Sequence, residues 1–281
     1  MGVTYNGLKQ SIIMNSSKPE KDELISLLCE GKTRSEIAEI FKVHETTITR
    51  WFRKFKINVK DYTEFRLSYN VHLFDTIDSE EKAYWLGFLY ADGCVAYNAP
   101  RNSYYFKIEL KSTDVEHLKK FKDFLQDTRE GIIKIITRTF NGKEFEACRY
   151  QISNEHLAKT LINLGCTIRK SLTLTFPDSS VFKKPNLVFD FIRGYTDGDG
   201  SLTHDMKRPR ISIIGTNEFL TEVIKYLPQF NKVYKSGNQF VVSTSGIKAK
   251  IIANKLYGHA TIYLDRKYEK FKSQFEYKDG E

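Results

Sequence analysis

Two segments of the sequence end in an aspartate followed by a glycine, and the residues before this pair also agree. Residues 84–93 and 191–200 both have the pattern aromatic-x-x-Gly-aromatic-x-x-small-Asp-Gly, and they lie 107 positions apart. The pattern predicts two helices that end at Asp92 and Asp199, each followed by a glycine in the left-handed conformation. Carboxylates at helix C-termini are repelled by the helix dipoles and by each other. If the two meet, a hard cation that prefers oxygen ligands must lie between them, which indicates Mg²⁺.

The spacing of small residues predicts how the two helices meet. Residues four apart lie on the same face of a helix, which groups Gly87 with Ala91 and Gly194 with Gly198. Two such faces can approach to backbone contact, with the C-terminal ends side by side. Helix-end carbonyl groups have no partner within the helix, so they can supply further oxygen ligands.

The repetition continues beyond these two helices. Three further pairs of segments match in the same order, namely 107–114 with 210–217, 158–159 with 249–250, and 168–170 with 265–267. Each copy predicts a helix, two strands, a helix, two strands and a final helix. We therefore expect an α+β fold with two pseudo-symmetric repeats, over residues 79–178 and 179–281.

The pattern of residues 1–60 predicts a separate helical domain. A linker over residues 61–78 is expected to join this domain to the repeats. Thr33 and Glu36 have the spacing of a capping box at the start of a helix. A further helix is expected from about Glu45, with apolar residues on one side and hydroxyl and basic residues on the other.

Within this domain, residues 36–51 resemble the helix-turn-helix of resolvase-like and transcription-factor DNA-binding domains. Ala38 leaves room for the two helices to cross closely, and Val43 and Ile48 fill the angle between them. Lys42 stands where the family favours glycine at a left-handed position. The side chains expected to face DNA are Thr47, Arg50, Arg53 and Lys54. A three-helix bundle with a solvated basic face is the alternative.

The repeated segments resemble the paired motifs of single-chain LAGLIDADG homing endonucleases. Aligned on the final Asp-Gly, residues 85–93 and 192–200 cover the two motifs, and the resemblance extends over roughly residues 79–275. In that family the acid beside the last glycine binds metal and helps to activate water. The resemblance assigns this role to Asp92 and Asp199.

The resemblance also implies roles for neighbouring residues. The residue before each acid can add its main-chain carbonyl to the metal, which would be Ala91 and Gly198. Members of the family often have a central lysine that stabilises charge on the scissile phosphate, and Lys170 and Lys267 are the candidates. A backbone phosphate contact or a surface charge is the equal alternative for these lysines. Asp197 has a tyrosine as its counterpart in the first copy, so we interpret it as structural rather than as a ligand.

Alternation along the strands predicts which side chains face the target. Phe106, Ile108 and Leu110 fall on one face of a strand, and Tyr105, Lys107, Glu109 and Lys111 fall on the other. The polar residues that could reach base edges of DNA are Lys107, Lys111, Lys134, Arg138, Arg149, Gln151, Arg210 and Ser212. Any half-solvated sheet shows such alternation, so the pattern alone does not distinguish a DNA-binding face.

The composition is compatible with these predictions. Lys and Arg number 44 against 35 Asp and Glu, a net charge of +9 that suits a polyanionic partner. Hydrophobic residues make up 41% of the chain, which excludes a disordered protein. The four cysteines contain no Cys-x-x-Cys pair that could hold zinc. No apolar stretch is long enough for a membrane span or a signal peptide, so we expect a soluble, intracellular protein.

The resemblance to LAGLIDADG homing endonucleases implies that the two repeats form a DNA-binding saddle. Together with the patterns above, it predicts a site-specific double-strand DNA endonuclease that uses Mg²⁺ to hydrolyse phosphodiester bonds. We expect a free-standing or intron-encoded enzyme, a monomer without an obligate protein partner, acting on a long asymmetric DNA site. The alternatives on the same fold are a non-catalytic transcription regulator and an intron RNA maturase. The acids retained in both motifs favour the nuclease.

Overall fold

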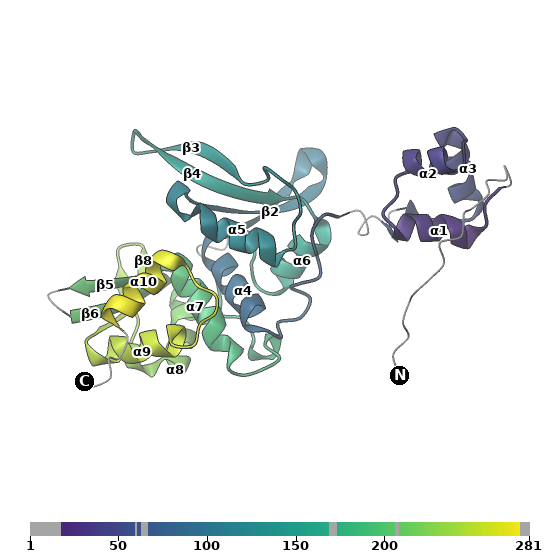
Figure 1. Cartoon of the computed structure of the whole chain (residues 1–281). Helices are drawn as coiled ribbons and strands as arrows, with labels where there is room; N and C mark the ends of the chain where they lie inside the picture. Colours follow the sequence, from purple (N-terminus) through teal and green to yellow (C-terminus); the bar gives the residue numbers. More distant parts are fainter. Residues whose placement is uncertain (1–17, 60, 63–66, 169–172, 206–207, 276–281) are drawn as a thin grey trace. The chain divides into compact units, whose positions relative to one another are not determined.

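The chain forms two compact units in the computed structural model. The units are Met1–Ser68 and Tyr69–Glu281, and Figure 1 labels their elements. The structure describes residues 18–59, 61–62, 67–168, 173–205 and 208–275. None of the described helices is both long and apolar enough to cross a lipid bilayer.

The described part of the first unit contains three short helices. They are α1 (Lys21–Cys29), α2 (Arg34–Ile40) and α3 (Glu45–Lys54). Their core contains Leu24, Leu28, Ile37, Ile48 and Phe52. The predicted capping box is confirmed, because the Glu36 N–H donates to Thr33 Oγ1 at 3.2 Å and the Thr33 N–H donates to the Glu36 carboxylate at 2.6 Å. Lys42 has a φ of 52°, so it occupies the predicted left-handed position at a cost of about 1 kcal/mol.

The boundary between the units lies after Ser68, earlier than the predicted end of the linker. Val71, Phe74 and Ile77 are buried in the second unit. The Phe74 ring packs edge-on against Phe124 with 5.4 Å between centroids. These apolar residues are scattered among polar ones without a helical or strand period, which explains why the segment resembled a linker.

The second unit repeats one order of elements. The first repeat contains α4 (Glu80–Asp92), β1 (Gly93–Asn98), β2 (Ser103–Lys111), α5 (Val115–Phe124), β3 (Lys134–Phe140), β4 (Lys143–Ile152) and α6 (Glu155–Asn163). The second contains α7 (Leu187–Asp199), β5 (Gly200–Asp205), β6 (Arg208–Gly215), α8 (Asn217–Tyr226), β7 (Tyr234–Ser236), β8 (Gln239–Ser245) and α9 (Ile247–Tyr257). A further helix, α10 (Asp265–Gln274), follows the second repeat. Short 3₁₀ turns lie at Ala99–Arg101, Ser112–Asp114, Ser179–Val181 and Pro228–Phe230.

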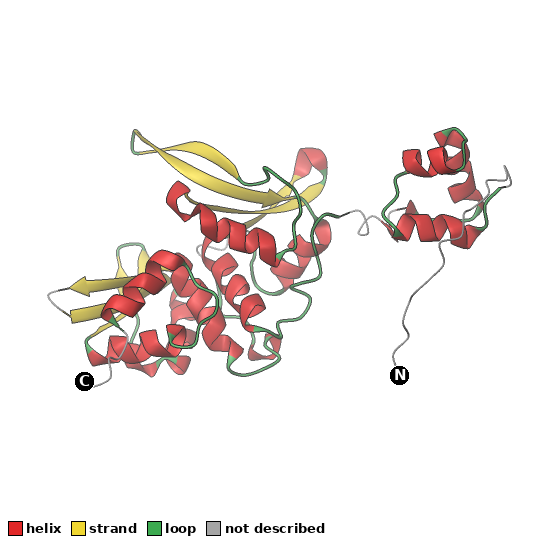
Figure 2. Cartoon of the chain, viewed as in Figure 1, coloured by secondary structure: helices red, strands yellow, loops and turns green. Residues whose placement is uncertain are grey.

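Within the described residues, each repeat forms one four-stranded antiparallel sheet, and the two sheets have the same topology. The strand orders are β1-β2-β4-β3 and β5-β6-β8-β7. Helices α5 and α6 pack against one face of the first sheet, as Figure 2 shows, and α8 and α9 contact the second sheet. The inward residues of β2 and β6, such as Phe106, Ile108, Ile211 and Ile213, are fully buried. The predicted α+β fold with two pseudo-symmetric repeats is confirmed.

Candidate functional site

Helices α4 and α7 pack against each other through their glycines, as the small-residue spacing predicted. A Cβ atom on Gly87 would lie 1.9 Å from the carbonyl oxygen of Phe191. A Cβ atom on Gly194 would lie 1.9 Å from the carbonyl oxygen of Tyr84. These contacts are equivalent, since Tyr84 and Phe191 open the two matched segments. Any side chain at either glycine would force the two backbones apart.

The crossing brings the C-terminal ends of the two helices together. A Cβ atom on Gly198 would lie 2.2 Å from Ala91 Cβ and 3.0 Å from Asp92 Oδ2. The Asp92 carboxylate therefore lies against the residue that precedes Asp199. Asp92 is half-buried and Asp199 is exposed, so neither carboxylate is enclosed by apolar side chains.

The charges of both acids affect two neighbouring side chains, Tyr195 and Lys267. Burial raises the pKa of Tyr195, and the carboxylates of Asp199 and Asp92 raise it further. Burial lowers the pKa of Lys267 to about 8, although nearby carboxylates, including Asp92 and Asp199, oppose the shift. The negative charges of the two acids are thus concentrated in one small region. Two carboxylates beside helix-end carbonyls form a hard oxygen donor set, which suits Mg²⁺.

Lys267 lies beneath the end of α7 and is only 4% exposed. Its ammonium group donates to three carbonyl oxygens, those of Thr196 at 2.7 Å, Asp197 at 2.6 Å and Gly200 at 2.7 Å. A cation in this place stabilises the C-terminal end of the helix. The alternative of a surface charge is therefore wrong for Lys267, because the side chain is buried. Lys170, its predicted counterpart, lies outside the described residues.

Asp197 is buried, at 1% exposure, in a network of polar groups. Its carboxylate accepts hydrogen bonds from the hydroxyls of Tyr84 and Tyr257, both at 2.7 Å, and from the N–H of Leu264 at 2.8 Å. The Tyr84 hydroxyl lies 3.0 Å from His117 Nε2. Since Tyr84 donates its one proton to Asp197, neutral His117 must donate from Nε2. This network joins the first repeat to the second, in agreement with the structural interpretation of Asp197.

The glycines after the two acids are not left-handed, which corrects the prediction. Gly93 has a φ of −73° and Gly200 has a φ of −102°, and these residues begin β1 and β5. Glycine is required there by close approach instead. A Cβ atom would lie 2.5 Å from the Leu89 carbonyl oxygen at Gly93, and 2.5 Å from that of Thr196 at Gly200. Each strand therefore leaves its helix without room for a side chain.

On the first sheet, the predicted basic residues gather around one carboxylate. Glu109 accepts hydrogen bonds from Lys107 Nζ at 2.6 Å, Arg138 Nη2 at 2.5 Å and Arg149 Nε at 3.0 Å. Burial disfavours the ionised form, but hydrogen bonds from Lys107 and Arg138 lower the pKa of Glu109 to about 2. The other predicted residues of this face, by alternation and strand register, are Lys111, Lys134 and Gln151. Three cations around one anion leave the face basic.

The described part of the second sheet presents basic side chains beside serine and threonine hydroxyls. Arg210 Nε donates to Ser243 Oγ at 2.9 Å, and Ser212 pairs with Ser243 in the register of β6 and β8. Arg208 and Lys235 line the same shallow hollow. Arg208 and Ser243 were not predicted from the sequence, although a period of two extends from Arg210 back to Arg208.

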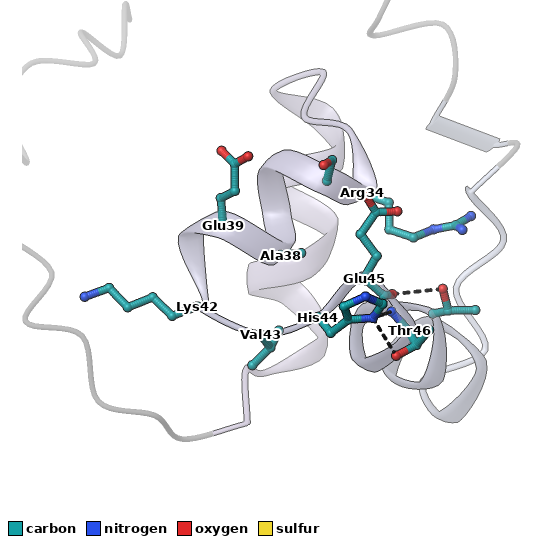
Figure 3. A pocket seen from close by; sticks show the side chains of 10 residues that line it. Arg34, Ala38, Glu39, Lys42, Val43, His44, Glu45 and Thr46 are labelled. Carbon is teal, nitrogen blue, oxygen red and sulfur yellow. Dashed lines mark hydrogen bonds between the residues drawn. The ribbon is translucent and has the colours of Figure 1, made fainter.

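In the first unit, the turn between α2 and α3 lines a hollow that includes Arg34, Lys42 and His44 (Figure 3). His44 Nδ1 accepts a hydrogen bond from the Thr46 N–H at 3.3 Å and so caps α3. The residues predicted to face DNA lie on α3, where Thr47 is half-buried and Arg50, Arg53 and Lys54 are exposed.

Comparisons with known proteins agree with this architecture. Residues 79–164 match the family model described as a LAGLIDADG-like domain. The homing endonuclease I-WcaI bound to its DNA recognition sequence is similar in structure, with a TM-score of 0.50 and 14% identity over 69% of this chain and 87% of that chain. I-DmoI in complex with DNA and Ca has a TM-score of 0.47 and 18% identity over 73% of this chain and 100% of that chain. No curated protein sequence matches significantly. The chain thus contains a LAGLIDADG-like domain and has the homing endonuclease fold.

Proposed function

We propose that this protein is a site-specific endonuclease that cleaves double-stranded DNA with a divalent metal ion, Mg²⁺ in particular. One observation carries the proposal: α4 and α7 pack closely through Gly87 and Gly194, and the Asp92 carboxylate lies against Gly198, the residue before Asp199. The shared fold supports it, since I-WcaI of this fold is a homing endonuclease bound to its DNA recognition sequence.

Asp92 and Asp199, with the main-chain carbonyls of Ala91 and Gly198, would hold the metal. When bound, the metal polarises the phosphodiester and makes water a stronger nucleophile. The two carboxylates orient the attacking water and accept its proton. Lys267 acts as a positioning residue, because it holds the carbonyls at the end of α7 and thereby places Asp199.

The outer faces of the two sheets supply the DNA contacts in this proposal. The residues concerned are Lys107, Lys111, Lys134, Arg138, Arg149, Gln151, Arg210 and Ser212. Arginine, lysine and glutamine side chains can bind base edges in the major groove. Because one chain carries both repeats, each with its own acid and sheet, a monomer can cut both strands of a long asymmetric site.

The first unit would add a helix-turn-helix contact to DNA through α3, with Thr47, Arg50, Arg53 and Lys54. Deleting residues 1–68 is expected to weaken DNA binding and to reduce its salt dependence, since each lost phosphate contact lowers the slope by about 0.9. Cleavage at saturating protein should persist. A salt dependence equal to that of the full chain would contradict DNA contact by this unit.

The test of the nuclease is cleavage of supercoiled plasmids that carry a library of candidate sites, with and without Mg²⁺. Asp92→Asn and Asp199→Asn should each lower the cleavage rate on the order of 10³-fold, because several kcal/mol of transition-state stabilisation are lost. Asp123→Asn, at an exposed carboxylate of α5, is the matched control and should cut normally. Wild-type cleavage of both strands by Asp92→Asn would overturn the proposal. Sequence-specific binding without any nicking would indicate a regulator, and assisted intron splicing a maturase.

A further inference from the structure

A second group of metal-ligating side chains lies at the start of the second unit. His72 Nδ1 lies 2.7 Å from Asp75 Oδ2, and His156 Nε2 lies 2.7 Å from Asp75 Oδ1. One ligand atom from each residue can be chosen so that all three lie within 4.8 Å of one another. The centroids of the two imidazole rings are 4.6 Å apart, and the ring planes are tilted by 55°. One nitrogen of each ring therefore lies close to the same carboxylate.

The main chain holds both sides of this group in place. Phe74, between His72 and Asp75, is fully buried, and the Asp75 N–H donates to the His72 carbonyl at 3.1 Å. His156 lies in the first turn of α6. Thr160, one helical turn later, donates its hydroxyl to Asp75 Oδ1 at 3.4 Å. Outer hydrogen bonds of this kind orient metal ligands.

We propose that His72, Asp75 and His156 form a Zn²⁺ site. Two imidazole nitrogens and one carboxylate oxygen suit Zn²⁺, whereas Mg²⁺ prefers oxygen ligands alone. The side chains of the three residues are 52%, 37% and 46% exposed, so an ion can enter from solvent and keep a water molecule as its fourth ligand. Each imidazole can bind Zn²⁺ only through a nitrogen that carries no proton, so binding would replace the N–H···O contacts with Asp75 by bonds from nitrogen and carboxylate oxygen to the ion.

The ion would join the segment that leads into α4 to helix α6, across a separation of 81 residues between Asp75 and His156. Closing such a loop in the folded state alone stabilises that state. The site uses different donor atoms from the pair Asp92 and Asp199, so it does not depend on the proposed nuclease activity.

The test is titration of the full-length protein with ZnCl₂ in excess MgCl₂, followed by calorimetry and thermal unfolding. We expect one Zn²⁺ per chain at this site and a rise in Tm that increases with free Zn²⁺. His72→Gln and His156→Gln should each weaken Zn²⁺ binding by about 100-fold or more, since outer-shell changes alone cost 10–100-fold. Two control variants should keep both signals: His259→Gln removes an exposed histidine elsewhere, and Cys94→Ser removes an exposed thiol.

X-ray absorption of the Zn²⁺-loaded wild-type protein gives a result that does not depend on variant folding. A first shell of nitrogen and oxygen with imidazole scattering supports the site, whereas sulfur ligation would overturn it. Wild-type Zn²⁺ affinity in the double variant His72→Gln/His156→Gln would also overturn it. So would a wild-type Tm that does not respond to Zn²⁺, because the three side chains would then be no more than a hydrogen-bonded contact.

Discussion

The two repeats share their helix crossing and strand order, but they differ at the position two residues before the terminal acid. In the second repeat this position is Asp197, a buried carboxylate with three hydrogen-bond donors and Lys267 nearby. In the first repeat it is Tyr90, whose hydroxyl donates to the Leu164 carbonyl. The features that remain equal are those that place the two acids.

The outer faces of the sheets differ in the same way. In the first sheet, Lys107, Arg138 and Arg149 are held by Glu109. In the second, Arg210 is held by a serine hydroxyl. Two half-sites with such different side chains are suited to different DNA sequences, which agrees with the asymmetric target of the proposed function.

The largest effect we expect is a loss of stability when the glycines at the crossing of α4 and α7 are replaced. The loss should be equal in the two repeats. Gly87→Ala and Gly194→Ala should each lower the free energy of unfolding by about 3 kcal/mol or more, since the new methyl group meets backbone atoms that cannot rotate away. Urea unfolding measures the change. Gly237→Ala, in open space at a φ of 58°, is the control and should cost roughly 1 kcal/mol. Tolerance of alanine at only one of the two helix glycines would refute the equivalence.

Substitutions at the two matched positions that differ, Asp197 and Tyr90, should reduce stability by unequal amounts. Asp197→Asn should lower the free energy of unfolding by about 2–3 kcal/mol, because an amide cannot accept all three hydrogen bonds and a negative charge close to Lys267 is lost. Tyr90→Phe should cost about 1 kcal/mol, since one neutral hydrogen bond is lost. Both values come from urea unfolding at pH 7. Equal losses would show that the two side chains have equivalent roles.

The features that occur in both repeats could be predicted from the sequence. Most of the features that differ between the repeats could not. The glycine spacing and the two acids occur twice in one chain, so repetition distinguished them from chance. The conformation of Gly93 was predicted wrongly, because Asp-Gly usually ends a helix in a left-handed turn and the close approach of β1 has no local signature. The burial of Lys267 and the cluster around Glu109 depend on contacts between residues distant in sequence. His72 and His156 were missed for the same reason.

The buried network that includes Asp197 predicts a pH effect specific to the first repeat. Burial lowers the pKa of His117 to about 3. The unfolded chain protonates this imidazole below about pH 6.5 while the folded chain does not, so stability is lost as the pH falls from 6.5 toward 3. At pH 5 the loss is about 2 kcal/mol. His117→Gln, which can still donate to Tyr84, should lack this part of the loss between pH 7 and pH 5.

The measurement is urea unfolding of both proteins at the two pH values, with His259→Gln as the control that should follow the wild type. An equal loss of stability between pH 7 and pH 5 in His117→Gln and the wild type would contradict the prediction, because burial would then not keep the imidazole neutral. The difference between the repeats would in that case depend on Asp197 alone.

The smallest effect we expect is a change of about 1 kcal/mol in the free energy of DNA binding. This change should have opposite signs for a substitution on the first sheet and one on the second. Glu109→Gln should strengthen DNA binding and steepen its salt dependence, because cations now held by the carboxylate become available to phosphate. Arg210→Gln should weaken binding and reduce the slope by about 0.9, since the variant lacks one cation that could contact phosphate. Fluorescence anisotropy over a range of KCl concentrations measures both slopes. Glu116→Gln, an exposed acid of α5 paired with Lys119, is the control. Changes of the same sign at Glu109 and Arg210 would mean that the acid helps to bind DNA, by accepting hydrogen bonds from bases, rather than limiting the charge of its sheet.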